Sequence, residues 1–135
     1  MKEIVVPAVI ENLPKVVSFI EDELEALDCP VKAQMQIDVA VDELFTNIAS
    51  YAYDPGTGDA IIRFDFDETD RIVTISFMDS GMPFDPLAKP DPNVKVPLKE
   101  RQAGGLGIFL VKKTMDRVEY RYENGMNNLT IQKQI

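Results

Sequence analysis

Histidine is absent from this chain, and cysteine occurs once, as Cys29. The lack of histidine excludes a Ser-His-Asp triad, a His-ligated zinc site and any histidine of this chain as a phosphorylation site. A single cysteine excludes an internal disulfide, and without a neighbouring histidine it is a poor metal ligand or catalytic thiol. We therefore interpret Cys29 as a packing residue.

Positive charge is scarce as well. Lysine and arginine number 14 against 23 aspartates and glutamates, which gives a formal net charge of −9. Such a charge repels phosphodiester backbones, and no stripe of Lys and Arg offers the counterion release on which nucleic-acid binding depends. We therefore expect no direct contact with DNA or RNA.

Long hydrophobic runs are also missing. Asp, Glu or Lys interrupts each apolar window well before membrane-spanning length, and the opening Met1-Lys2-Glu3 does not begin a signal peptide. We expect no membrane segment and a cytoplasmic location. The 45% hydrophobic residues are sufficient for one core, so residues 1–135 are predicted to form a single domain.

The spacing of apolar residues predicts the order of the elements. A short strand within residues 2–9 stops at Pro7, which suits a sheet edge because proline cannot donate to a ladder. The other predicted elements are a helix from Asn12 to Cys29, a helix from Val31 to Tyr53, strands at 60–66 and 71–78, a helix at 104–115, and strands at 118–122 and 129–135 around an Asn124-Gly125 turn. This order predicts an α/β two-layer sandwich with a mixed, mainly antiparallel sheet and helices on one face.

Residues 80–103 have a different character. Five of the nine prolines occur there among charged residues, with no apolar period: Pro83, Pro86, Pro90, Pro92 and Pro97. A loop of this length in so small a domain is usually a functional lid or a disordered segment. We interpret it as a lid.

Glu43 and Asn47 are the first candidate site residues. They are four positions apart on the second predicted helix, so their side chains lie one above the other at the border of its apolar stripe. The carboxylate could serve as a general base, and the amide oxygen could bind Mg²⁺. The alternative is that both side chains are simply solvated, as such residues on helices usually are.

Two glycine turns supply further candidates. Asp79-Ser80-Gly81 ends a predicted strand, where the carboxylate could accept the exocyclic amine of adenine and Gly81 would let the backbone approach the base. Gly104-Gly105-Leu106-Gly107 opens the third predicted helix, whose free N–H groups and dipole attract phosphate. Taken separately, the first could be an ordinary turn and the second a flexible hinge.

Taken together, these segments resemble the ATP-binding domain shared by gyrase, Hsp90, histidine kinases and MutL. They are most similar to its stand-alone branch, the anti-sigma-factor serine/threonine kinases. Residues 41–47 resemble the N-box of that family, residues 79–81 its adenine-binding box, and residues 104–107 its second glycine box. The resemblance covers nearly the whole chain and implies a histidine-kinase-like ATP-binding fold.

The resemblance also implies roles for individual residues. Glu43 would activate the attacking hydroxyl, Asn47 would hold Mg²⁺, and Asp79 would receive the N6 amine of the ATP adenine. Arg101 resembles a position that approaches the terminal phosphate, and Thr130 resembles a hydroxyl that supports adenine. The implied nucleotide-binding residues are Asn47, Asp79, Gly81, Gly104, Gly105, Leu106, Gly107 and Thr130.

Two residues depart from the family pattern. Pro83 stands where the usual Asp-x-Gly-x-Gly box has its second glycine, which suits the stand-alone kinases better than the histidine kinases. Tyr51 stands where relatives of this branch often have histidine, so the efficiency of phosphotransfer in this chain is open.

The function implied is a homodimeric, ATP- and Mg²⁺-dependent protein serine/threonine kinase that phosphorylates a STAS-type anti-anti-sigma partner and binds a sigma factor. Three alternatives remain open at this point. The chain could be a nucleotide-gated binding module without turnover, the detached catalytic domain of a histidine kinase, or a structural domain without a ligand.

Overall fold

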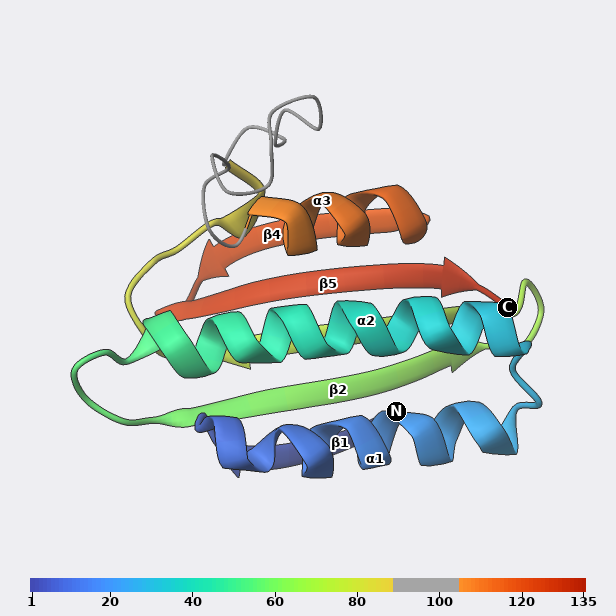
Figure 1. Ribbon diagram of the computed structural model, residues 1–135, viewed down its shortest axis with the longest axis horizontal. Coiled ribbons are helices and arrows are strands. Elements are labelled where there is room, and N and C mark those ends of the chain that lie inside the picture. Colours follow the sequence, from blue (N-terminus) through green and yellow to red (C-terminus); the bar gives the residue numbers. More distant parts are fainter. Residues whose placement is uncertain (89–104) are drawn as a thin grey trace.

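The computed structural model describes residues 1–88 and 105–135. Five strands and three α-helices make up most of this part of the chain (Figure 1). In order they are β1 Lys2–Pro7, α1 Leu13–Ala26, α2 Val31–Asn47, β2 Asp59–Asp67, β3 Ile72–Asp79, α3 Gly105–Thr114, β4 Arg117–Glu123 and β5 Met126–Gln134. Short helical turns precede α1 and follow β3, at η1 Ile10–Asn12 and η3 Pro86–Ala88.

The strands form one sheet in the order β1-β2-β3-β5-β4, and each of its four pairings is antiparallel. β1 lies at an edge, as the sequence predicts from Pro7. The β4–β5 hairpin closes at Glu123↔Met126, with Asn124 at φ 55° and Gly125 at φ 73° between them. Two consecutive positive φ angles are the mark of a type I′ turn, for which Asn-Gly is the preferred pair.

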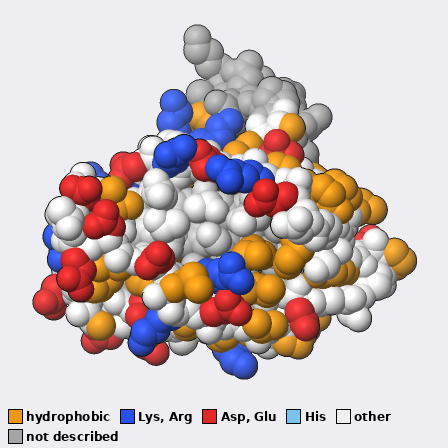
Figure 2. Space-filling model, turned by 180° about the vertical axis from the view of Figure 1, so that it is seen from behind, with side chains coloured by type: hydrophobic (Ala, Val, Ile, Leu, Met, Phe, Trp, Pro, Cys, Tyr) orange, Lys and Arg blue, Asp and Glu red, His pale blue; other side chains and the backbone are white. Residues whose placement is uncertain are grey.

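All three α-helices cover the same face of the sheet (Figure 1). Alternate strand residues therefore face the helices and are buried, as in β3, where Val73, Ile75 and Phe77 are each 1% exposed. The opposite face has no helix over it and carries a mixture of charged, polar and hydrophobic side chains (Figure 2). The expected α/β two-layer sandwich is thus confirmed, but the described sheet is antiparallel throughout rather than mixed, because each strand runs opposite to the strands it pairs with.

The second helix departs from the prediction at its C-terminal end. The α-helix stops at Asn47, and the next five residues form a π-helical segment, η2 Ile48–Ala52, where the sequence predicts one helix to Tyr53. A wider turn keeps Ala52 buried but changes the direction of the side chains around it. Apolar spacing alone does not distinguish such a turn from an α-helix. π-Helical turns are rare and often stand at functional sites.

Candidate functional site

A pocket opens where the end of α2 meets the ends of β3 and β5. Its lining is mostly apolar, with a few polar side chains among the apolar ones, as is usual for small-molecule sites. Asn47 and Asp79 both line it, so the structure brings two of the predicted segments to one place. The other lining residues are Leu44, Ile48, Ala52, Phe77, Met82, Phe84, Pro86, Tyr120, Asn127 and Leu129.

Asp79 is the acidic residue of this pocket. It ends β3 on the helix-covered face and is only 4% exposed. Its Oδ1 accepts hydrogen bonds from the Gly81 backbone N–H and from the Asn127 side-chain amide, both at 2.9 Å. Within residues 1–88 and 105–135 these are its two partners, so Oδ2 can accept a further donor such as an exocyclic amine.

Gly81 fits tightly against the π-helical end of α2. A Cβ atom at this position would lie 2.1 Å from the carbonyl oxygen of Ala52, so only glycine fits. The next residue, Met82, donates its N–H to that same carbonyl oxygen at 3.1 Å. The glycine predicted to admit the base thus also holds the turn after β3 against η2.

Tyr53 holds the same turn from the other side. Its hydroxyl accepts the Ser80 N–H at 2.7 Å and donates to the Asp59 carbonyl at 2.6 Å. A Cβ atom on Gly58 would lie 2.3 Å from the nearest ring atoms of Tyr53, so the ring packs directly against this glycine. One phenol therefore joins the end of α2, the start of β2 and the turn that follows Asp79.

Asn127 is a site residue that the sequence reasoning missed. It pairs with Asp79 in the β3–β5 register and is 6% exposed. Its amide nitrogen donates to Asp79 Oδ1 and to the Met82 carbonyl, both at 2.9 Å. Its oxygen accepts the Phe84 N–H at 3.1 Å and the Tyr120 hydroxyl. The sequence offered one signal for it: Asn127 stands two residues after Gly125, at a position that alternates with the apolar Leu129 and Ile131.

Thr130 requires a correction, because the structure does not bring it to this pocket. Its hydroxyl bonds the Ser76 hydroxyl at 3.1 Å and the Asn128 side-chain oxygen at 3.2 Å, on the uncovered face of the sheet. Side chains alternate along a strand, so Thr130 and Asn128 face away from Asn127 and Leu129, which line the pocket.

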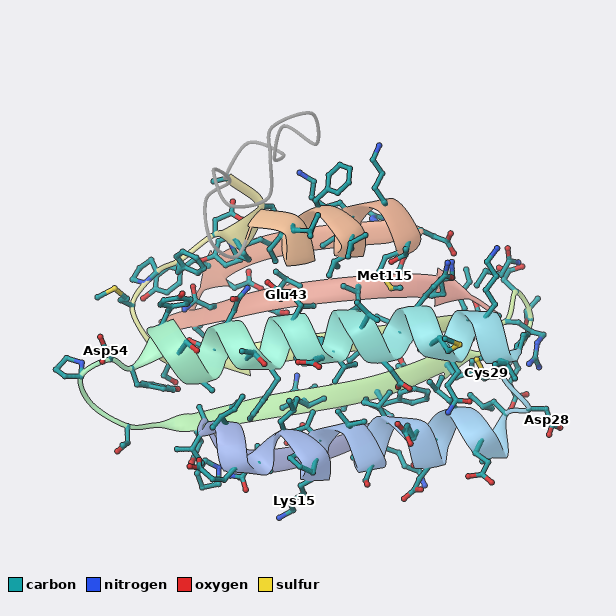
Figure 3. The ribbon with its side chains drawn as sticks, in the orientation of Figure 1. Lys15, Asp28, Cys29, Glu43, Asp54 and Met115 are labelled. Carbon is teal, nitrogen blue, oxygen red and sulfur yellow. The ribbon has the colours of Figure 1, made fainter. Side chains whose placement is uncertain are left out.

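Glu43 lies one turn before Asn47, on the side of α2 that faces α3 (Figure 3). A Cβ on Gly107 would come within 2.1 Å of the Glu43 carboxyl carbon, so the carboxylate stands directly against the start of α3. Burial raises the pKa of Glu43 above its ordinary value, and the nearby Asp42 carboxylate raises it further. A hydrogen bond with the Asn47 side chain opposes this rise in pKa.

Asn47 offers an oxygen for a metal ion. A hydrogen bond that lowers the pKa of Glu43 is one in which the Asn47 amide nitrogen donates, and the oxygen of the same amide is a group that can bind a cation. One such oxygen suits Mg²⁺, which usually takes few protein ligands and completes its octahedron with water and phosphate. Among the described residues, no group of three or more His, Cys, Asp or Glu side chains is placed to hold a metal.

The glycine-rich turn is only partly within the described structure. α3 begins at Gly105, and Leu106 is 36% exposed at its first turn. Gly107 meets Glu43, which brings the third predicted segment beside the first. Arg101 and Gly104 lie outside the described residues, as does most of the predicted lid.

Comparison with known proteins supports the family resemblance of these motifs. Residues 6–133 match the family described as the histidine kinase-like ATPase domain. The chain belongs to this family. The resemblance that its N-box, adenine-binding box and glycine box indicated is thereby confirmed at the level of the family and its fold.

Among curated members of this family, the chain is similar to proteins named as kinases. It is 30% identical over 100 residues to the serine/threonine-protein kinase BtrW of Bordetella bronchiseptica, covering 74% of this chain and 70% of that protein. It is 34% identical over 96 residues to the serine-protein kinase RsbW of Halalkalibacterium halodurans, and 32% identical over 95 residues to RsbW of Bacillus cereus. Each RsbW match covers 67% of this chain but only 56% and 58% of those proteins, respectively.

In residues 1–88 and 105–135, no helix combines the length and the apolar character that crossing a bilayer demands.

Proposed function

We propose that this histidine kinase-like ATPase domain is an ATP-dependent protein serine/threonine kinase that also serves as an anti-sigma regulatory factor. Its phosphoryl acceptor would be a hydroxyl on a STAS-type anti-anti-sigma partner, and its second partner a sigma factor. The observation that supports this most is the single pocket shared by Asn47 and Asp79, with Glu43 set against the start of α3. The kinase names of its relatives agree with it.

Each residue has a distinct role in this proposal. Asp79 accepts the adenine N6 amine through Oδ2, while Gly81 lets the backbone approach the base. Asn47 holds Mg²⁺ through its amide oxygen, and the ion would neutralise charge on the ATP phosphates. The glycine turn at residues 104–107, with Gly105, Leu106 and Gly107 described at its end, offers backbone N–H groups to those phosphates.

The transfer step depends on Glu43. Its carboxylate takes the proton of the acceptor hydroxyl as the hydroxyl oxygen bonds to the γ-phosphorus, and the bond to the β-phosphate oxygen breaks to release ADP. Burial, which raises the pKa of Glu43, makes the carboxylate a stronger base than an exposed one. Arg101, outside the described residues, would approach the terminal phosphate.

The wider biological setting follows from the same family resemblance. We propose a single domain over residues 1–135, a homodimeric assembly, a cytoplasmic location and a role in transcription regulation through the sigma factor. The formal charge of −9 supports action through protein partners rather than through direct binding to nucleic acid.

A two-part experiment tests the proposal. Binding of Mg-ADP is measured first by calorimetry and by thermal shift, where ligand at 100 times its dissociation constant should add about 2.7 kcal/mol to the free energy of unfolding. Labelled ATP is then mixed with the chain and candidate partners, for wild type and Glu43→Ala. We expect acid-stable label on the partner, about 100-fold slower with the variant and dependent on Mg²⁺.

The outcomes separate the competing functions. Equal labelling by wild type and Glu43→Ala would exclude Glu43 as the base. Tight binding of ATP and ADP without transfer to any partner would favour a nucleotide-gated binding module. Acid-labile label would favour a histidine of another chain as the acceptor. The absence of a thermal shift with Mg-ADP would favour a structural domain that binds no nucleotide.

A further inference from the structure

Asn127 is the most fully bonded side chain of the pocket, and neither the resemblance nor the sequence gives it a role. Its side-chain amide can donate two hydrogen bonds and accept two, and all four are made. The partners come from three places in the fold. They are Asp79 at the end of β3, the backbone of residues 82–84, and Tyr120 on β4.

The direction of this amide is fixed by partners that can act in one way only. The Phe84 N–H can only donate, so the oxygen of Asn127 must face it at 3.1 Å. The Met82 carbonyl can only accept, so the nitrogen must face it at 2.9 Å. The second N–H of that nitrogen then points at Asp79 Oδ1, at 2.9 Å.

This arrangement has a consequence for recognition of the base. The amide and the Gly81 N–H together saturate Asp79 Oδ1, which leaves Oδ2 as the oxygen that can receive an adenine amine. The same amide holds the segment from Met82 to Phe84, and the side chains of these two residues line the pocket.

We propose that Asn127 is a positioning residue that orients the base-binding carboxylate of Asp79 and ties it to the 82–84 segment, so that occupation of the base site and the order of this segment are coupled. The inference rests on the nucleotide site of the proposed function. Asn127 touches no substrate in it and acts through Asp79.

The test uses the change Asn127→Asp, which keeps the size of the side chain but replaces its two N–H donors by a carboxylate. At about pH 8 that carboxylate faces both Asp79 and the Met82 carbonyl, so the affinity for Mg-ADP should fall about 10- to 100-fold. At about pH 5.5 the two carboxyl groups can share one proton, which restores the bond to Asp79 but not the bond to Met82, and part of the affinity should return.

The other titratable groups around Asn127 are few. Tyr120 faces it from β4, and Asp85, close to Tyr120, stands before η3. The pKa of Tyr120 is raised by burial, so its phenol stays neutral across this pH range. From α2 the pocket receives Leu44 and Asn47, and from η2 it receives Ile48 and Ala52, none of which carries a charge. The pH dependence of Asn127→Asp is therefore expected to come from its contact with Asp79.

Asn128→Asp is the matched control, since it introduces the same carboxylate one residue further on, toward the uncovered face of the sheet. Wild type and Asn128→Asp should bind Mg-ADP with nearly equal affinity at both pH values. Equal losses in Asn127→Asp and Asn128→Asp, or no loss in Asn127→Asp, would overturn the proposal. Asn127→Ser serves if Asn127→Asp does not fold, and should lose about 10-fold in affinity at both pH values; wild-type affinity in that variant would also overturn it.

Amide exchange measured by NMR separates this inference from the proposed function. In wild type the Gly81 and Phe84 N–H groups should be protected without nucleotide, and Mg-ADP should increase the protection of Phe84. In Asn127→Ser both should exchange about 10-fold faster. If wild type fails to bind Mg-ADP, the nucleotide site is refuted, while the Gly81 and Phe84 rates still report whether Asn127 holds this turn. Unchanged rates in the variant would overturn the inference even if nucleotide binds.

Discussion

The Glu43 carboxylate lies directly against Gly107: a Cβ atom on the glycine would be 2.1 Å from the carboxyl carbon of the glutamate and 2.2 Å from its Oε2. The Glu43 carboxylate therefore keeps its position against the start of α3 only because residue 107 has no side chain. This close approach joins the N-box helix to the glycine box, and it makes the position of the Glu43 carboxylate sensitive to the smallest possible substitution in α3.

The first prediction concerns Gly107→Ala. The added methyl meets the end of a flexible side chain, so the carboxylate should move away while the fold persists. Alanine also favours a helix by up to about 1 kcal/mol over glycine, so the melting temperature should stay equal or rise. Phosphoryl transfer should nevertheless fall at least about 10-fold, because the base is displaced.

A double-variant cycle checks the cause of that loss. Once Glu43→Ala has removed the carboxylate, adding Gly107→Ala should change neither transfer nor nucleotide affinity any further. Additive losses of transfer would mean that the methyl group acts on the phosphates rather than on Glu43. A Gly107→Ala protein that transfers at the wild-type rate would contradict the prediction altogether.

The second prediction is a pH profile. Glu43 must be ionised to accept a proton, and its pKa is raised, first by burial and then by Asp42. The transfer rate should therefore fall toward acid pH with a midpoint above the ordinary glutamate value of about 4.3. Single-turnover transfer with saturating Mg-ATP measures this midpoint directly. A midpoint at or below the ordinary value, or one shared by the Mg-ADP affinity, would contradict the assignment.

Local sequence signals predict much of this fold because they act over a few residues. Pro7 predicts an edge strand and Asn124-Gly125 a tight hairpin, and the structure has both. The π-helical segment after Asn47 escapes prediction, since apolar spacing does not distinguish it from an α-helix and its contact with the turn at Gly81 joins residues far apart in the sequence.

The site shows the same division between local and distant information. The pairing of Asn47 with Asp79 in one pocket follows from motif order, which a known family supplies. Thr130 is assigned to the adenine site by the resemblance of the last strand alone, and a resemblance does not show which face of the sheet a side chain takes. Asn127 bonds backbone groups of residues 82–84, whose position no residue type reveals. Faces and partners of this kind require the three-dimensional register.

The third prediction compares two tyrosines close together in the chain. Tyr53→Phe removes the hydroxyl that joins Ser80 to Asp59, and should reduce the free energy of unfolding by about 1–2 kcal/mol. The Mg-ADP affinity should fall with it, since the turn after Asp79 loses this bond. Tyr51→Phe is the control, because Tyr51 is 56% exposed and should change stability by less than about 0.5 kcal/mol. Urea unfolding of both variants measures the difference, and equal effects would contradict the prediction.

Asp38 carries a cost to stability that lies away from the pocket. It stands on α2 opposite Glu21 of α1, and its Oδ1 is buried without a hydrogen-bond partner among the described residues. Burial, followed by the charge of Glu21 and a hydrogen bond with it, raises the pKa of Asp38 from 3.8 to about 6. The folded chain therefore holds this proton more tightly than the unfolded chain does.

The fourth prediction follows from that difference. Between pH 3.8 and about 6 the folded state binds more protons at Asp38 than the unfolded state, so the contribution of this group to stability falls as pH rises and stays low above about 6. Asp38→Asn removes the buried charge, so it should raise the free energy of unfolding at about pH 8. The expected gain is about 1 kcal/mol, because solvent screens the charge of this partly exposed group. At about pH 4 the gain should vanish, because the native carboxyl is then protonated. Urea unfolding at both pH values measures this, with exposed Asp22→Asn on α1 as the control. A gain of equal size at both pH values, or the same gain in Asp22→Asn, would show that the charge of Asp38 is not its source.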